Sequence, residues 1–425
     1  MIGIGISIPM MMPFAEDATA FVRSGVLRSP FTITRAQTGG VQSTAINGGN
    51  NGLTFYGADV PRFTRPAQRL LIEGQGTNTI RNPGAEGAIA GTPGTMPTNW
   101  VAAGNGAGLS WNVAGFGFEN DTPYVDIRLS GTSSSLSSPL IRADQVYPIA
   151  SVGQVWSHSV SIRIVSGSLT GISSVNLLVT EWTSGNIFLS LQSLAVSVST
   201  LFQRQSITAT LAQATVGLAG SQISVSPQIG VAIDCTFRII APQLELGFPS
   251  SPIFPPVGTP GASTRGHDRV SASLSSLGIA ANGACTVLWS GVVPNFITGS
   301  THTIACLDDG TGDNRFTMRV DQASGQLQAQ RSLLAQGSAT ANAGAVTAGA
   351  AIKGGMALNG SGRAAVSLNG GAVAAVTGGP SSGLTQFRLG NLFADLASMF
   401  GETTSLRILP FVSDSDLQSL TGAMP

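Results

Sequence analysis

Two of the five tryptophans in this sequence stand next to turns rather than inside regular segments. Trp182 ends an alternating run and precedes Thr-Ser-Gly-Asn, and Trp111 lies between a glycine-rich turn at 104–108 and Asn112. An aromatic face at such a position can stack on the C–H groups of a sugar ring, while neutral amides and hydroxyls bind its OH groups. Trp111 and Trp182 are therefore candidate carbohydrate-binding residues, with packing in a core as the alternative for each. Trp156 and Trp289 lie within alternating runs and are expected in cores.

The one acidic cluster is Asp308-Asp309-Gly-Thr-Gly-Asp313-Asn. Carboxylate oxygens on a tight glycine-containing loop suit Ca²⁺, so Asp308, Asp309 and Asp313 are candidate ligands for that ion. The spacing does not match an EF-hand, and a hairpin turn with a solvated acidic tip is the alternative. No other cofactor is indicated.

The sequence contains no convincing catalytic motif. Gly379-Pro-Ser381-Ser-Gly383 matches G-x-S-x-G in form, but a nucleophile elbow needs a strand before the serine and a helix after it, and neither is expected here. The three histidines are far apart in the sequence and have no metal-ligand spacing. Acidic residues in the first half show no pairing of the kind that glycoside hydrolysis requires. We expect a protein that is not an enzyme.

The composition excludes several kinds of partner. Of 425 residues only 42 carry a formal charge, 21 of each sign, while 54 are glycine and 42% are hydrophobic. Zero net charge argues against binding to nucleic acid or to anionic membranes, and the apolar content argues against disorder. No run is long enough to insert as a membrane helix.

The three cysteines lack C-x-x-C spacing and are expected as buried free thiols, with a Cys285–Cys306 bridge as the alternative.

The first eight residues alternate, with Ile2, Ile4, Ile6 and Ile8 on one face and small residues on the other. Period two with β-branched residues predicts a strand, which Pro9 ends. Such an apolar strand either pairs inside its own fold or docks onto another subunit by strand addition. These four isoleucines are therefore candidate attachment residues. Residues 16–24 could form one short helix.

The rest of the chain predicts an all-β protein with two β-sandwich domains. Short alternating runs separated by Ser, Thr and Gly clusters fill residues 76–248 and 265–425, and no βαβ rhythm appears. Residues 249–264 contain five prolines and predict a semi-rigid linker. Residues 1–75 precede the first sandwich as a separate N-terminal segment.

Short sequence motifs predict two hairpins and one short helix in the second domain. Asn359-Gly360 and Asn369-Gly370 each lie between alternating runs, which is typical of β-hairpins. Ser413 or Asp414 is a suitable N-cap for a short helix that continues to Leu420.

Three passages resemble a known group of proteins. RLLIEGQGTNTIRNPGAEGAIAGTPGTMPTNW (69–100) and PQLELGFPSSPIFPPVGTPGASTRGHDRV (242–270) resemble the start and end of the carbohydrate-binding-module-like jelly roll found in structural proteins of tailed phages and gene transfer agents. FYGADVPRF (55–63) resembles the lead-in segment of the same group. RLGN (388–391) followed by SLRILPFVSDSDLQSLT (405–421) resembles the closing strands of concanavalin A-like, laminin-G-type jelly rolls. Together these passages span about residues 55–425.

The resemblance implies a virion surface protein: a tail fibre, head fibre or spike, made in the bacterial cytoplasm and located on the particle. In this hypothesis residues 1–75 attach the protein to other virion proteins, and the sandwiches bind host cell-surface polysaccharide. A homo-oligomer is expected, because repeated copies must match a symmetric platform. A purely architectural decoration protein and a polysaccharide-degrading spike enzyme are the alternatives.

Overall fold

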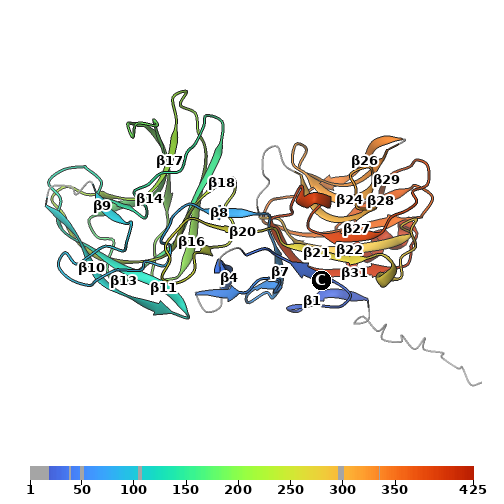
Figure 1. Cartoon of the computed structure of the whole chain (residues 1–425), viewed down its shortest axis with the longest axis horizontal. Helices are drawn as coiled ribbons and strands as arrows, with labels where there is room; N and C mark the ends of the chain where they lie inside the picture. Colours follow the sequence, from blue (N-terminus) through green and yellow to red (C-terminus); the bar gives the residue numbers. More distant parts are fainter. Residues whose placement is uncertain (1–18, 38–39, 48–51, 104–107, 295–300, 335) are drawn as a thin grey trace, which may run out of the picture.

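The computed structural model describes residues 19–37, 40–47, 52–103, 108–294, 301–334 and 336–425. Ile2, Ile4, Ile6 and Ile8 lie outside these residues. The chain is all-β, and two β-sandwiches lie side by side with a narrow junction between them (Figure 1). The strand pairings between described residues are all antiparallel, which confirms the predicted fold class.

The first sandwich consists of two five-stranded sheets. One sheet has the order β10-β11-β18-β13-β16 and the other has the order β15-β14-β17-β12-β9. The strands of the first sheet are β10 (Leu109–Glu119), β11 (Thr122–Thr132), β13 (Val155–Gly167), β16 (Gln203–Thr210) and β18 (Ala232–Leu246). The strands of the second sheet are β9 (Val101–Ala103), β12 (Leu140–Arg142), β14 (Ile172–Trp182), β15 (Phe188–Val196) and β17 (Leu218–Pro227). Their inner faces enclose one core that includes Trp100, Trp111 and Trp156.

The second sandwich packs a nine-stranded sheet against a seven-stranded sheet. The larger sheet contains β1 (Ala20–Arg23), β2 (Val26–Leu27), β6 (Arg62–Thr64), β7 (Arg69–Ile72), β22 (Cys285–Val292), β27 (Ala351–Leu358), β28 (Ala364–Leu368), β29 (Ala374–Val376) and β31 (Gly401–Leu409). The smaller sheet contains β3 (Thr32–Thr34), β21 (Arg269–Ser273), β23 (His302–Asp308), β24 (Asn314–Asp321), β25 (Gln326–Leu333), β26 (Gly337–Ala345) and β30 (Gln386–Leu389). Trp289 is fully buried between them, as the alternation predicted.

Several local predictions for this domain are confirmed. A hairpin at Asn359-Gly360 joins β27 to β28, and one at Asn369-Gly370 joins β28 to β29. Asn369 and Gly370 have φ values of 49° and 77°, the left-handed conformation that a tight hairpin turn requires. Helix α1 (Asp414–Ala423) is capped by Ser413, and its Leu417 packs on the outer face of the larger sheet. Cys285 and Cys306 are buried with free thiols, as is Cys235 in the first sandwich.

The predicted boundary at residue 75 is wrong, because the described part of the N-terminal segment completes the second sandwich. Strands β1 and β7 pair with β31, and β3 pairs with β21. Val22, Ile33 and Leu70 lie in the core of that sandwich. The helix expected at 16–24 is also wrong, since Ala20–Arg23 is a strand whose ladder partner lies nearly four hundred residues away.

The proline-rich linker at 249–264 is part of the folded junction rather than a separate spacer. Strand β19 (Ile253–Phe254) pairs with β4 (Gln42–Asn47), which in turn pairs with β5 (Gly52–Tyr56). Strand β20 (Ser263–Arg265) pairs with β8 (Gly76–Asn78), and both lie between the two sandwiches in Figure 1. These ladders tie the linker to the N-terminal segment.

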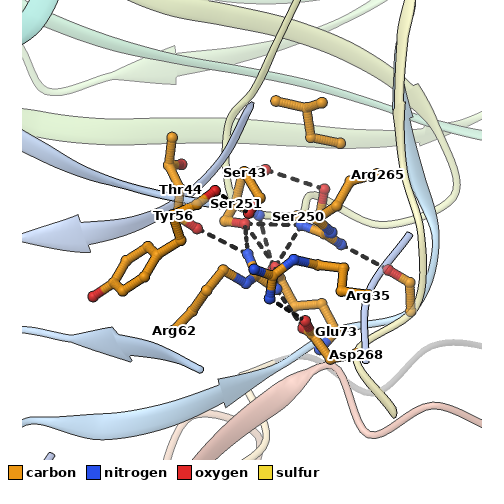
Figure 2. A network of polar contacts seen from close by, with 12 residues as sticks. Arg35, Ser43, Thr44, Tyr56, Arg62, Glu73, Ser250, Ser251, Arg265 and Asp268 are labelled. Carbon is orange, nitrogen blue, oxygen red and sulfur yellow. Dashed lines mark hydrogen bonds and ion pairs between the residues drawn. The ribbon is translucent and has the colours of Figure 1, made fainter. Parts of the chain in front are cut away.

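A buried network of charged side chains holds the junction together (Figure 2). Asp268 accepts from Arg35 at 2.7 Å and also pairs with Arg62. Glu73 pairs with Arg62 at 2.8 Å and with Arg265 at 2.7 Å. All five side chains are at most 8% exposed. They come from segments far apart in the sequence, so the network fixes those segments in one arrangement.

The carboxylates of this network are kept ionised. Burial alone would raise the pKa of Glu73 and of Asp268, but the neighbouring guanidinium groups outweigh burial and hold both values below their usual range. Backbone and hydroxyl donors add to the effect, since Ser251 donates to Glu73 through its N–H at 2.8 Å and its Oγ at 2.6 Å. Because the folded pKa values are lowered, this stabilisation is present above about pH 4 and is lost as pH falls further.

We predict that Asp268→Asn lowers the free energy of unfolding by about 3–5 kcal/mol, because it leaves buried guanidinium groups without their counter-charge. Urea denaturation of the full chain at pH 7 measures the change. The matched control is Asp234→Asn, which removes the carboxylate of an exposed pair with Arg128 (2.7 Å) and is expected to change stability little. Equal effects of the two substitutions would contradict a structural role for the network.

Candidate functional site: a groove on the first sandwich

A groove crosses the outer face of the β15-β14-β17-β12-β9 sheet. This face is available because alternate residues of each strand point inward to the core, which leaves the others outside. The volume of the groove is about 590 Å³, compared with 360, 280 and 240 Å³ for three other hollows on the described surface. We call it the Trp182 groove, and its lining residues are Ser138, Leu140, Arg142, Ser174, Asn176, Leu178, Trp182, Phe188, Leu191, Ser193, Gln222, Ser224 and Ser226.

Strand register arranges these residues in rows across the sheet. Ser224 of β17 lies beside both Leu140 of β12 and Asn176 of β14. In the next row Leu178 lies between Gln222 and Ser193. Further along β14, Trp182 lies beside Phe188 of β15. The groove therefore has an aromatic end at Trp182 and a floor of hydroxyl, amide and leucine side chains.

The aromatic end is a packed group of rings. The Trp182 centroid lies 5.2 Å from that of Tyr147 and 5.3 Å from that of Phe188. Trp182 Nε1 donates to Thr180 Oγ1 at 2.8 Å, which fixes the indole against its own strand. The side chain of Tyr147 fits beside Thr180 because position 220 is glycine: a Cβ there would lie 2.5 Å from Thr180 Oγ1 and 3.0 Å from the Tyr147 ring. Phe188 is 48% exposed, so this ring offers the more open apolar face.

Only some of the polar side chains on the floor of the groove form hydrogen bonds with other side chains of the protein. Asn176 Nδ2 donates to Ser174 Oγ at 2.9 Å and to Ser226 Oγ at 3.3 Å. Within the described residues no side-chain hydrogen bond engages Gln222 or Ser224, although both are at most 6% exposed. Neutral donors and acceptors that line a groove and lack internal partners are suited to the hydroxyl groups of a ligand.

His158 supports the groove from the core side. It is 1% exposed on β13, and its Nδ1 lies 3.2 Å from the backbone oxygen of Leu178 on the opposite sheet. Burial lowers the pKa of His158 to about 4; the hydrogen bond to Leu178 opposes this shift and the charge of Arg204 adds to it. The neutral ring therefore links the two sheets directly beneath a residue of the groove.

The structure separates the two tryptophans that the sequence singled out. Trp182 lies in the groove, although its ring is already in contact with Tyr147 and Phe188. The expectation of ligand contact at Trp111 is wrong: this residue is 5% exposed and packs against Phe237, with ring centroids 6.5 Å apart. Alternate residues of β10 face the core, and Trp111 is one of them, together with Leu109 and Val113. Its side chain therefore points inward.

Sequence reasoning missed Phe188 and Arg142. Phe188 begins the alternating strand that follows the loop after Trp182, so a strand pairing of the two segments would have indicated it. Arg142 ends a three-residue strand whose place in the sheet depends on pairing with β17 and β9, far away in the sequence. No local signal identifies it.

The acidic loop does not form a calcium site in this structure. Asp308 is fully buried and pairs with Arg388 at 2.6 Å. Asp309 accepts from the Thr311 N–H at 2.8 Å and from Asn314 Nδ2 at 2.8 Å, as a carboxylate does in a turn. Asp313 is exposed. Across the ranges that the structure describes, no three His, Cys, Asp or Glu side chains come together as metal ligands. The turn alternative accounts for these residues.

Two other acidic residues of the first sandwich, Glu119 and Glu181, are engaged in protein contacts. Glu119 pairs with Arg163 at 2.6 Å and with Arg238 at 2.9 Å. Glu181 is 2% exposed and accepts from Ser190 Oγ and from two backbone N–H groups. At the G-x-S-x-G match, Ser381 Oγ donates to the backbone oxygen of Asn282 at 3.1 Å in a loop, as expected of a turn.

Comparison with known proteins gives weak likenesses only. No family model matches the sequence, and no curated protein matches it. Among solved structures, a family 4 carbohydrate-binding module (CBM4) is 14% identical and covers 39% of this chain and 99% of its own, with a TM-score of 0.25. The mouse laminin α1 domains LG4-5 are 10% identical, cover 66% of this chain and 88% of their own, and have a TM-score of 0.25.

A third structure, the CBM22-1–CBM22-2 tandem domain of Paenibacillus barcinonensis Xyn10C, is 10% identical and covers 76% of this chain and 99% of its own, again with a TM-score of 0.25. Scores at this level are too low to inform the site or the function of this chain.

The described residues contain no helix that is long and apolar enough to cross a membrane.

We predict that His158→Asn flattens the dependence of stability on pH between 6.5 and 4. In this range the unfolded wild-type chain binds a proton that the folded chain excludes, so folding weakens as pH falls, by on the order of 3 kcal/mol in total. Asparagine keeps a donor for the Leu178 oxygen but does not titrate. Urea denaturation at several pH values measures the slope, and parallel slopes for the two proteins would contradict the assignment.

Proposed function

We propose that this protein binds polysaccharide through the Trp182 groove. The observation that carries the proposal is the pairing of an exposed aromatic ring, Phe188, with rows of neutral amides and hydroxyls on the same open sheet face. Sugar rings are recognised by this combination, because their C–H faces pack on aromatic rings and their OH groups need neutral hydrogen-bonding partners. The volume of about 590 Å³ lies within the ordinary range for ligand sites.

We further propose that this binding is not accompanied by catalysis. Glycoside hydrolysis usually needs two carboxyl groups on either side of the scissile bond. None of the thirteen residues that line the groove is Asp or Glu. This composition supports a binding protein over a polysaccharide-degrading spike enzyme.

The biological setting that we propose is the surface of a phage or gene transfer agent particle, where the protein attaches to host-surface polysaccharide. The sequence resemblance of residues 55–63, 69–100 and 242–270 to structural proteins of tailed phages and gene transfer agents supports this setting. In this proposal the N-terminal residues before the described part contact other virion proteins, and several copies per particle strengthen weak glycan contacts through avidity. An architectural protein without a ligand is the competing proposal.

We predict that Phe188→Ala weakens binding to a polysaccharide recognised by the wild-type chain by about tenfold or more, because the truncation removes an aromatic anchor from the groove. Trp182→Ala is expected to have a similar effect, and its fold needs checking by thermal unfolding because the ring is packed. Calorimetry with soluble oligosaccharide fragments measures the monovalent affinity.

The matched control is Phe118→Ala, which removes a ring that is 76% exposed on β10 of the other sheet. Its affinity should equal that of the wild type. Equal affinities for all three variants would overturn the groove as the binding site, and the absence of any glycan binding would favour the architectural alternative.

For the particle setting, we predict that a tagged copy of the protein appears on the outside of purified particles in electron micrographs labelled with an antibody to the tag. Surface labelling follows from an attachment role, because the sandwiches must reach the host. Particles that carry no label when the tagged protein is present in the same cells would contradict the virion proposal and leave the groove proposal intact.

A further inference from the structure

Arg142 is the one ionisable side chain among the residues that line the Trp182 groove. It ends β12, and its guanidinium carbon lies 5.6 Å from the centroid of the Trp182 ring. The groove is otherwise neutral, so the sign of its local charge is set by this residue.

The guanidinium group of Arg142 has no counter-charge among the residues that the structure describes. Four other arginines of the first sandwich each pair with a carboxylate, namely Arg81, Arg128, Arg163 and Arg238. Among the described residues, none lies within ion-pair or hydrogen-bond distance of the Arg142 side chain, and its Nε is buried without an acceptor. Arg142 is half-buried, and only its Nε is shut off from solvent, so its terminal N–H groups are free to donate to a ligand.

The contact with Trp182 orients this group without using its donors. A guanidinium plane that lies over an indole is held by the cation–π attraction, while its N–H groups at the edge stay available. That edge presents a fork of donors whose spacing matches the two oxygens of a carboxylate. The polar floor of Gln222, Ser224 and Asn176 lies in the rows beside it and is suited to the hydroxyl groups of the same ligand.

We propose that the Trp182 groove selects acidic polysaccharides, and that Arg142 binds the anionic group of a sugar residue whose ring packs at the aromatic end. This inference rests on the proposed function, since it names the class of glycan that the same groove takes. A sugar carboxylate is the group that the planar fork fits best, and sulfate or phosphate esters present related oxygen pairs.

The net charge of the chain is zero. In this proposal, selectivity for acidic glycans therefore comes from the local ion pair between Arg142 and the ligand, and not from a long-range field of the protein. Acid preference should therefore follow one residue. A general attraction to polyanions would instead be spread over many arginines.

The test uses the full chain and an array of bacterial surface polysaccharides in which each acidic polymer is also present in its carboxyl-reduced, neutral form, with dextran and dextran sulfate added. We expect the wild type to bind carboxylated polymers about tenfold more tightly than their reduced forms. In Arg142→Gln this ratio should fall to about one. Arg142→Lys, which keeps the charge but loses the fork, should give an intermediate ratio.

Arg128→Gln is the matched control, because it removes an exposed arginine from the other sheet and should leave the wild-type ratio intact. Thermal unfolding of each variant checks the fold. Equal binding to acidic and reduced polymers, or a preference that survives Arg142→Gln, overturns the inference while the proposed function stands. Stronger binding to dextran sulfate than to every carboxylated polymer overturns the choice of carboxylate. An array on which no polymer binds overturns both proposals.

Discussion

The way in which the N-terminal segment and the proline-rich segment join the second sandwich depends on the buried arginine–carboxylate network at the junction. Three guanidinium groups and two carboxylates lie out of water, and each must keep its partners at the same time. The attraction between such charges only offsets their desolvation, so a network of this kind contributes a single defined geometry more than net stability. Because the charges come from β6, β20 and the segments after β3 and β7 and before β21, one geometry for the network means one position for the N-terminal segment and the proline-rich segment against the second sandwich.

The scarcity of charge explains the character of the groove. Only one of the residues that line the groove, Arg142, carries a charge, and the polar part of this sheet face consists of serine, asparagine and glutamine. Hydroxyl and amide groups at fixed intervals along paired strands form a regular surface of neutral hydrogen-bonding sites. In our proposal, the single unpaired arginine in these surroundings determines which ligand fits. The core supports the same surface, since the neutral ring of His158 joins β13 to β14 beneath Leu178.

Much of the fold could be predicted from the sequence, because alternation, turns and caps are local. The hairpin at Asn369-Gly370, the helix start at Ser413 and the burial of Trp156 and Trp289 all follow from residues within a few positions of each other. The partner strands of β1 and β7 could not be predicted, because they pair with β31 at the opposite end of the chain. For the candidate site, the sequence pointed to Trp182, which lines the groove, while a role of Trp182 in ligand binding stays a prediction. The burial of Trp111 depends on which face of its sheet the alternate residues of β10 occupy. The nearness of Phe188 and Arg142 to Trp182 depends on strand register and side-chain packing across the sheet.

We propose that one groove, with Phe188 and Trp182 at one end and Arg142 beside them, binds an acidic glycan. A crystal structure of the protein with a bound acidic oligosaccharide would decide this. We expect a sugar ring against the aromatic end of the groove, with its carboxylate oxygens within hydrogen-bond distance of the Arg142 guanidinium group. A ligand bound on the second sandwich or at the junction, with the Trp182 groove empty, would rule out the proposed site.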